Sequence, residues 1–473
     1  MDDATLDRAF ARASGAPRRA GNRVRLLRNA AENYPAWLDA IASARRIIHC
    51  EMYIFHDDEQ GRLFSDALIG KAAEGVSVRL LYDWMGGRST PRRFWRRLRH
   101  ANVEVRCYNP PRFDRPLGWI SRNHRKAIIV DGAVAFVTGL CVGQAWVGNP
   151  AKHVDGWRDT GIELHGPAVA DVDAAFADSW ATAGTALAPS AASETQMTAG
   201  DVAVRVVASA PGKLGLFRVD EFVASIASRR LWLTDAYYGG TASYVQALRA
   251  AARDGVDVRL LVPGATDIPV LRPFSRAGYR PLLDSGVRVF EWNGSMIHAK
   301  TAVADGRWAR VGSTNLNVAS WIGNRELDIV VEDEGFGAAM EAMFLDDLEH
   351  ATEVVLDGNR VHAVGGAARP ASSGGGSSGR AMAGALRVGS TVAAAIGNTR
   401  VLEPVEATIA IAGSLLLGCV AWLAYDFPRG FSYPFAIVTA WLAAAALLRG
   451  IALSRERRHD PGAQKTAALD LRQ

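Results

Sequence analysis

Cysteine is scarce in this sequence, and the few cysteines lie far apart. The 473 residues contain four, Cys50, Cys107, Cys141 and Cys419, with no CxxC pair and no histidine at zinc-ligand spacing. Neither a disulfide framework nor a structural metal site is indicated, so we expect a reducing compartment. The first residues also contain no apolar segment, so we expect no secretory signal peptide.

Neither sign of charge dominates strongly. The net charge is +5 and the isoelectric point is about 9.1. A mildly basic chain suits a phosphate-rich partner, either nucleic acid or a membrane surface, although an Arg-rich composition explains the value equally well. At about 150 residues per domain, 473 residues are expected to hold two or three domains.

The chain contains an internal repeat. A strand-like run at residues 47–55, a helical pattern and a second strand-like run at 76–82 are typical of a βαβ unit. The same order returns later, and the segment 256–261 (VDVRLL) nearly repeats the segment 76–81 (VSVRLL). We therefore predict an α/β fold built from two duplicated lobes.

Each half carries a histidine and a lysine in an apolar, strand-like run. The second half has His298, Lys300 and Asp305, and the first half has His124, Lys126 and Asp131 at the same spacing. In a strand, residues i and i+2 point to the same face, so each histidine projects beside its lysine. The repeat predicts one site at the interface between the halves.

Two histidines on opposite sides of one phosphate can cleave a phosphodiester without metal or cofactor. One attacks phosphorus and forms a phosphohistidine, and the other protonates the leaving alcohol and then deprotonates the incoming one. Lys126 and Lys300 are expected to hold the non-bridging oxygens, together with Ser313 and Asn315 of the segment 312–315 (GSTN). These residues alone do not identify the attacking histidine.

A nucleophilic imidazole needs a fixed acceptor on its other nitrogen. Asp159 and Glu326 occupy matching positions of the repeat, each directly after an arginine. We expect Glu326 to support His298 in the second half and Asp159 to serve the first half.

Four further acidic residues occupy matched positions. Glu51 and Asp235 are rival candidates for supporting the histidines. Asp131 and Asp305 follow the strand-like runs directly, so we expect them to brace the next turn rather than touch a substrate.

The pattern HxKxxxxD followed by GSTN resembles the signature of the phospholipase D superfamily, over roughly residues 31–351. Five segments look like bacterial cardiolipin synthases: 51–55 (EMYIF), 108–113 (YNPPRF), 123–126 (NHRK), 157–159 (WRD) and 324–326 (NRE).

The resemblance implies two α/β/α lobes packed pseudo-symmetrically around one active site. It implies transfer of a phosphatidyl group from one phosphatidylglycerol to another, with release of glycerol. It also implies His124 as the nucleophile and His298 as the acid and base, with both lysines and both aspartates, Asp131 and Asp305, as members of the catalytic motifs.

The first half departs from the family pattern at one position. Cys141 stands where the family usually has an asparagine, opposite Asn315 in the repeat. We interpret Cys141 as a small buried residue, because no separate histidine motif marks it as a nucleophile.

The C-terminal region differs in composition from the rest. A Gly/Ser-rich stretch at residues 365–379 predicts a flexible linker, and two charge-free runs at 407–425 and 431–448 are near the ~20 residues that cross a bilayer. Arginines flank this pair on both sides, so the positive-inside rule places both ends in the cytoplasm. We expect a bacterial inner membrane protein with a cytoplasmic catalytic part.

The expected domains are a first lobe with a polar, basic N-terminal arm at residues 1–195, a second lobe at 196–362, a linker at 363–400 that could carry an interfacial helix, a transmembrane two-helix hairpin at 401–455 and a cytoplasmic tail at 456–473.

Other functions stay open at this stage. A hydrolytic phospholipase D, or another transphosphatidylase, would use the same intermediate with water or a different alcohol. A nuclease of the superfamily would need a basic groove with aromatic side chains and no membrane anchor. A silent scaffold is disfavoured because both motifs are intact. The expected partners are phosphatidylglycerol and a membrane, without nucleic acid.

Overall fold

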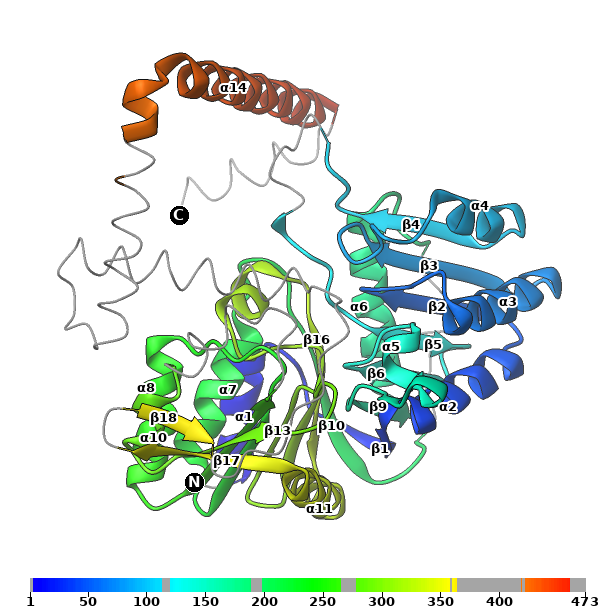
Figure 1. The fold of residues 1–473 in the computed structure, drawn as a ribbon. Coiled ribbons are helices and arrows are strands. Elements are labelled where there is room, and N and C mark those ends of the chain that lie inside the picture. Colours follow the sequence, from blue (N-terminus) through cyan, green and yellow to red (C-terminus); the bar gives the residue numbers. More distant parts are fainter. Residues whose placement is uncertain are drawn as a thin grey trace, which may run out of the picture. The chain divides into compact units, whose positions relative to one another are not determined.

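The computed structural model of the chain describes residues 3–112, 120–188, 198–264, 278–357, 360–363, 418 and 422–459 (Figure 1). The chain divides into two compact units, one within the ranges Met1–Tyr108 and Ser121–Arg387 and the other within Asn109–Ile120 and Val388–Gln473.

Helices and strands alternate along the first part of the larger unit, up to residue 108. The elements of the first half are α1 (Asp3–Ser14), β1 (Arg19–Arg28), α2 (Asn29–Ser43), β2 (Ile47–Met52), α3 (Glu59–Ala73), β3 (Ser77–Asp83), α4 (Arg92–His100), β4 (Glu104–Tyr108), β5 (Ala127–Val130), β6 (Val134–Thr138), α5 (Gln144–Val147), β7 (Gly148–Asn149), β8 (Val154–Asp155), β9 (Thr160–His165) and α6 (Val169–Thr182).

The second half follows the same order. Its elements are β10 (Val202–Ala208), α7 (Gly215–Ile226), β11 (Arg230–Thr234), α8 (Ala242–Arg253), β12 (Asp257–Pro263), α10 (Arg280–Leu283), β13 (Arg288–Trp292), β14 (Thr301–Ala304), β15 (Trp308–Gly312), a π-helical turn at Ala319–Gly323, β16 (Leu327–Glu332), α11 (Glu334–Glu349), β17 (Ala351–Asp357) and β18 (Arg360–Ala363).

One mixed sheet of 16 strands runs through the described part of both halves. β1 and β10 pair antiparallel in the middle. Outward from this pair, the order β9-β6-β5-β2-β3-β4 on one side matches β16-β15-β14-β11-β12-β13 on the other. The predicted α/β fold is confirmed (Figure 1), and the matching strand orders follow the sequence repeat.

Three large hydrophobic clusters stabilise the described part of the larger unit. One cluster combines both halves and includes Ile162 of β9, Ile329 of β16, Phe176 of α6 and Phe344 of α11. Each of the other two covers the sheet of one half: α2, α3 and α4 pack on the sheet of the first half, and α7 and α8, joined by α1 from the N-terminus, pack on that of the second. The shared cluster therefore joins the halves through apolar burial.

The N-terminal segment is not the surface arm that its polar composition predicted. Helix α1 packs against α7 of the second half, where the rings of Phe10 and Phe222 lie 4.9 Å apart. Buried Arg205 of β10 forms an ion pair with Asp7 and donates to the Ala16 carbonyl (3.2 Å). The prediction failed because it used the charge of the segment alone and did not consider the apolar face that these residues form in a helix.

The smaller unit contains α14 (Pro428–His459), which includes the apolar run at residues 431–448. Most of the other apolar run, residues 407–425, lies outside the described residues, as does the predicted linker except Ala363. Within the part of the chain that is described, no helix combines the length and the apolar character needed to cross a membrane. The transmembrane hairpin thus stays a prediction.

Candidate active site

Backbone hydrogen bonds join each histidine segment to the opposite half. The His124 N–H donates to the Arg325 carbonyl (2.9 Å), and the His298 N–H donates to the Arg158 carbonyl (2.7 Å). His124 lies just before β5 and Arg325 just before β16, while His298 lies just before β14 and Arg158 just before β9. The structure thus brings the two histidine segments together between the halves.

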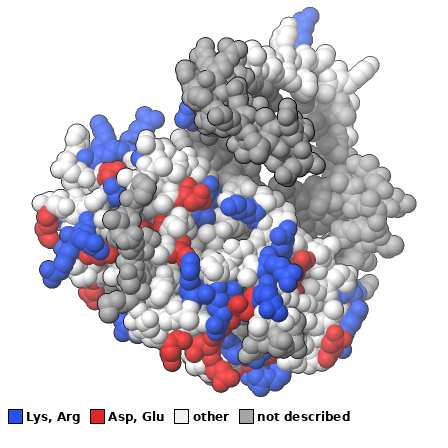
Figure 2. Space-filling view, turned by 180° about the vertical axis from the view of Figure 1, so that it is seen from behind, with Lys and Arg blue, Asp and Glu red and all other residues white. Residues whose placement is uncertain are grey.

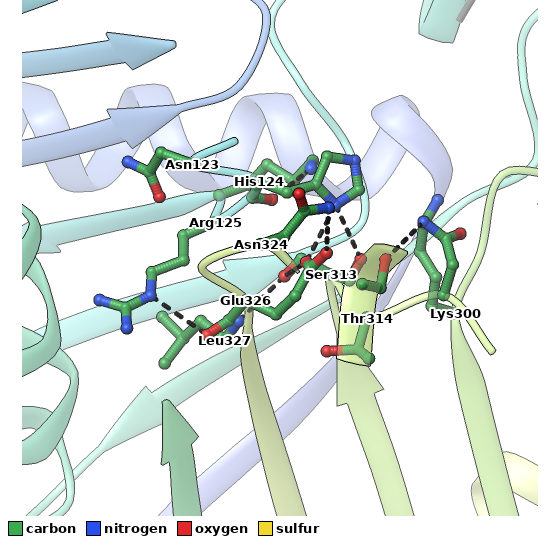
Figure 3. Close-up of polar contacts among 12 residues, drawn as sticks. Asn123, His124, Arg125, Lys300, Ser313, Thr314, Asn324, Glu326 and Leu327 are labelled. Carbon is green, nitrogen blue, oxygen red and sulfur yellow. Dashed lines mark hydrogen bonds and ion pairs between the residues drawn. The ribbon is translucent and has the colours of Figure 1, made fainter. Parts of the chain in front are cut away.

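The side-chain partners of the histidines are crossed in the same way. His124 Nδ1 lies 2.9 Å from Glu326 Oε2, and His298 Nδ1 lies 2.7 Å from Asp159 Oδ2 (Figure 3 shows the first pair). The expectation that Glu326 supports His298 is therefore wrong. Each arginine carbonyl that binds one histidine segment directly precedes the carboxylate that binds its imidazole, so the backbone pairing determines the crossing.

Burial controls the protonation of both pairs. Desolvation, helped by the nearby ammonium groups, lowers the pKa of His298 to about 3 and also lowers that of His124. Burial opposes ionisation of Asp159 and Glu326, but their histidine partners keep both carboxylate pKa values below the usual range. An ionised carboxylate only accepts hydrogen bonds, so each Nδ1 carries the hydrogen and each Nε2 offers its lone pair.

Both lysines are buried beside the histidines. Lys126 and Lys300 each donate a hydrogen bond to the carbonyl of the histidine two residues earlier. Burial is the main cause that lowers the pKa of Lys126, and that of Lys300 to about 8. Each ammonium group lowers the pKa of both imidazoles, so the four groups lie within electrostatic reach of one another.

The Ser313 hydroxyl binds the Glu326 carboxylate, so it is not available as a phosphate ligand. The hydroxyl donates to Glu326 Oε2 (2.6 Å), and the Ser313 carbonyl lies 3.1 Å from His124 Nδ1. Asn315 is buried, and its Oδ1 has no hydrogen-bond partner among the described residues. Asn315 is therefore the better placed of the two predicted phosphate ligands.

A buried ion pair anchors the segment 312–315. Arg310 donates to Asp328 Oδ2 (2.7 Å), while Asp328 Oδ1 accepts from the backbone N–H groups of Ser313 (2.8 Å) and Thr314 (3.1 Å). In the first half, Phe136 occupies the strand position of Arg310. The second half thus holds its loop by charge, whereas the first half uses apolar packing.

Cys141 is a core residue, as interpreted from the sequence. It is buried in the hydrophobic cluster of the first half, and its carbonyl accepts from the Tyr34 hydroxyl (2.7 Å). Burial raises the pKa of the thiol, which disfavours the reactive thiolate.

Glu51 and Asp235 are buried but bind other groups than the histidines. Glu51 accepts from the Asn123 side-chain amide (2.6 Å), and burial raises its pKa. Asp235 accepts from the N–H groups of Tyr237 (2.8 Å) and Leu316 (2.7 Å), and burial raises its pKa to about 7. Neither is the imidazole partner that the rival assignment required.

Asp131 and Asp305 brace turns, as expected. Asp131 follows β5 with φ of 53° and accepts from the N–H groups of Arg45, Arg46 and Ile47 at 2.7–2.8 Å. Asp305 makes the matching contacts to residues 228–230 after β14. Both lie at the strand end away from the histidines. Their placement corrects the view that they belong with the reacting groups of the motifs, because their contacts act on the fold.

Aromatic rings enclose the imidazoles, and the sequence reasoning missed them. The centroid of Tyr53 lies 4.8 Å from that of His124, while Tyr237, Trp146 and Trp157 lie 5.5–5.8 Å from His298. Tyr53 and Tyr237 occupy matching repeat positions, which could have revealed them. The two tryptophans lie where the halves differ in length, so the repeat carries no signal for them.

Comparison with known proteins gives one consistent family. Residues 37–143 and 224–348 match the family model described as "Cardiolipin synthase, PLD-like domain". Cardiolipin synthase A of Pseudomonas aeruginosa is 34% identical over 363 residues, which cover 75% of this chain and 72% of that protein. The Pseudomonas putida protein of the same name is 32% identical over 360 residues, covering 74% and 73%.

The fold has a similar solved structure. Phosphatidylserine synthase from Haemophilus influenzae aligns with a TM-score of 0.57 and 15% identity, over 73% of this chain and 91% of that one. At that identity the likeness concerns the fold.

A methyl group at Gly139 is expected to disable the His298 pair. A Cβ there would lie 2.1 Å from Asp159 Oδ1, so Gly139→Ala must displace the carboxylate. We expect phosphodiester turnover to fall about 100-fold, since a ~1 Å misplacement of a catalytic group can cost that much. Steady-state kinetics on the folded variant measure this.

Gly70 provides the control. It lies in α3, where an added Cβ would meet no described atom within 4 Å beyond the helix itself. Gly70→Ala should therefore keep wild-type turnover and gain ~0.5–1 kcal/mol of stability. Wild-type turnover in Gly139→Ala would mean that the placement of Asp159 is unimportant.

Proposed function

The chain belongs to the cardiolipin synthase family of phospholipase D-like proteins, and from this membership we propose that it transfers a phosphatidyl group from one phosphatidylglycerol to a second, giving cardiolipin and glycerol. The observation that carries the chemistry is the pair of buried histidines, each held by a carboxylate from the opposite half. Such a pair supplies a nucleophile and an acid around one phosphate.

His124 is the proposed nucleophile, by analogy with the family. Its Nδ1–H is bound by Glu326, so Nε2 attacks phosphorus, forming the P–N bond as the P–O bond to glycerol breaks. His298 gives a proton to the departing glycerol oxygen. It then takes the proton of the second phosphatidylglycerol's hydroxyl, whose oxygen forms the new P–O bond as the P–N bond breaks.

His298 must be protonated to act as the acid, although it is neutral in the lipid-free protein. The ammonium groups of Lys126 and Lys300 contribute to its low pKa. A phosphodiester placed between these groups brings a negative charge that favours the imidazolium. The lysines and Asn315 would then stabilise the charge on the five-coordinate phosphorus.

Two alternatives differ in substrate rather than in site. A hydrolytic phospholipase D would let water replace the second lipid. A nuclease would bind a polyanion along a basic band, but basic and acidic side chains are interspersed on the described surface of the face in Figure 2. The family membership favours transfer between lipids.

Purified protein mixed with phosphatidylglycerol vesicles is expected to release one glycerol for each cardiolipin formed, measured by mass spectrometry. His124→Ala and His298→Ala should each lower the rate at least ~1,000-fold, because each removes a reacting group. His165, a histidine paired with Glu163 outside the site, offers the control variant His165→Ala with near wild-type rate. Phosphatidic acid as the main product would identify hydrolysis instead.

The charge of Lys300 predicts an alkaline limit to activity. Its pKa is lowered to about 8, so the ammonium is present below that pH and is lost as the pH rises through it. We expect kcat/KM to decline above about pH 8, and Lys300→Arg to move this decline to higher pH because arginine stays charged. Lys71 of α3, which pairs with Glu74 outside the site, offers the control variant Lys71→Arg. An unchanged alkaline limb in Lys300→Arg would assign the limb to another group.

We also propose that residues 401–455 attach the chain to the bacterial inner membrane, with the catalytic part in the cytoplasm. The two apolar runs and their flanking arginines support this, as do exposed apolar side chains on α14 such as Phe435, Ile437 and Leu447. Truncation after residue 363 should move the protein from the membrane pellet to the soluble fraction. Retention of the truncated protein in the pellet would place the attachment elsewhere.

A further inference from the structure

A tryptophan of α5 binds the carboxylate that supports His298. The Trp146 indole N–H donates to Asp159 Oδ2 at 2.9 Å, the same oxygen that lies 2.7 Å from His298 Nδ1. Trp146 is 2% exposed, and its ring meets the imidazole edge-on, with centroids 5.7 Å apart and planes at 84°. The indole therefore contacts both members of the pair.

The second carboxylate has an equivalent donor of a different kind. Glu326 Oε2 accepts from the Ser313 hydroxyl (2.6 Å) while it holds His124. The strand registers place Gly139 opposite Ser313 in the repeat. A serine cannot enter there, because its Cβ would lie 2.1 Å from Asp159 Oδ1.

We propose that Trp146 is a positioning residue for phosphatidyl transfer: its indole N–H fixes the Asp159 carboxylate, and through it the His298 imidazole, as the Ser313 hydroxyl fixes Glu326 and His124. The donor that the first half lacks at Gly139 comes from a separate element, α5. The π-helical turn Ala319–Gly323 holds the corresponding place between β15 and β16, but its Trp321 indole N–H donates to Asp220 Oδ2 (3.0 Å). The kinetic readout of this role rests on the proposed function.

Loss of the indole N–H donor is expected to raise the pKa of Asp159. The charged and titratable groups around Asp159 are His298 and Lys300 next to β14, Lys126 next to β5, and Cys141 and Tyr34. Trp146 is one of the groups that hold the Asp159 pKa below its usual range against burial. Without it the carboxylate takes up a proton at a higher pH and releases the imidazole from its fixed tautomer.

Trp146→Phe keeps an aromatic ring and removes the N–H. In this variant we expect the acid limb of kcat/KM to move up by about half to one pH unit, with kcat reduced about tenfold and KM nearly unchanged. Ser313→Ala should produce a comparable change through Glu326. A purely structural role of the indole would lower activity without moving the limb.

Trp157 supplies a matched control. Its ring lies 5.5 Å from His298 and 4.9 Å from Trp146, yet within the described chain it makes no hydrogen bond to Asp159. Trp157→Phe removes a similar volume beside the same imidazole and should leave the position of the acid limb at the wild-type pH. An unmoved limb in Trp146→Phe, or an equal shift in Trp157→Phe, overturns the proposal.

A second measurement separates this proposal from the proposed function. In protein labelled with 15N-histidine, the His298 ring signals report the Nδ1–H tautomer as the pH falls, without any turnover. Their transition should occur at higher pH in Trp146→Phe than in the wild type and in Trp157→Phe. If the wild type is inactive on phosphatidylglycerol but Trp146→Phe shows this shift, only the proposed function is wrong. If the wild type is active but Trp146→Phe shows no shift, only the proposed role of Trp146 is wrong.

Discussion

The site depends on the exchange of carboxylates between the halves. His124 receives Glu326 and His298 receives Asp159, so neither half contains a complete histidine pair. The exchange requires the segments before β5 and β14 to lie against the segments before β16 and β9. The central β1–β10 pairing and the shared core between α6 and α11 hold the halves in that arrangement.

The crossed pairs also set the electrostatics. Buried carboxylates stay ionised because imidazole N–H groups and ammonium groups face them, and the imidazoles stay neutral because burial and the same ammonium groups disfavour a further charge. As a result, both imidazoles are neutral near neutral pH, and the Nε2 lone pair of each is free to attack or to accept a proton. A buried ion network of this kind adds little net stability by itself, so the proposed reaction accounts for it better than folding does.

Much of this could be predicted from the sequence, because duplication leaves matched patterns. The α/β fold, the two His-Lys segments, the turn-bracing role of Asp131 and the core position of Cys141 were all within reach. The exchange of carboxylates between the halves could not be predicted, because a repeat shows which residues correspond but not which half each side chain faces. Trp146 also escaped, because it lies in a stretch where the halves differ in length.

Helix α1 has a consequence for the order in which the chain can fold. It is the first described element to leave the ribosome, but its apolar face packs against α7, about 200 residues later, and its Asp7 pairs with Arg205. β1 likewise can complete its strand pairings only after β9 and then β10 have been synthesised. Helix α1 can therefore reach its native contacts only after β10 and α7 have been synthesised. A chain that ends before α7 leaves the apolar face of α1 without its packing partner.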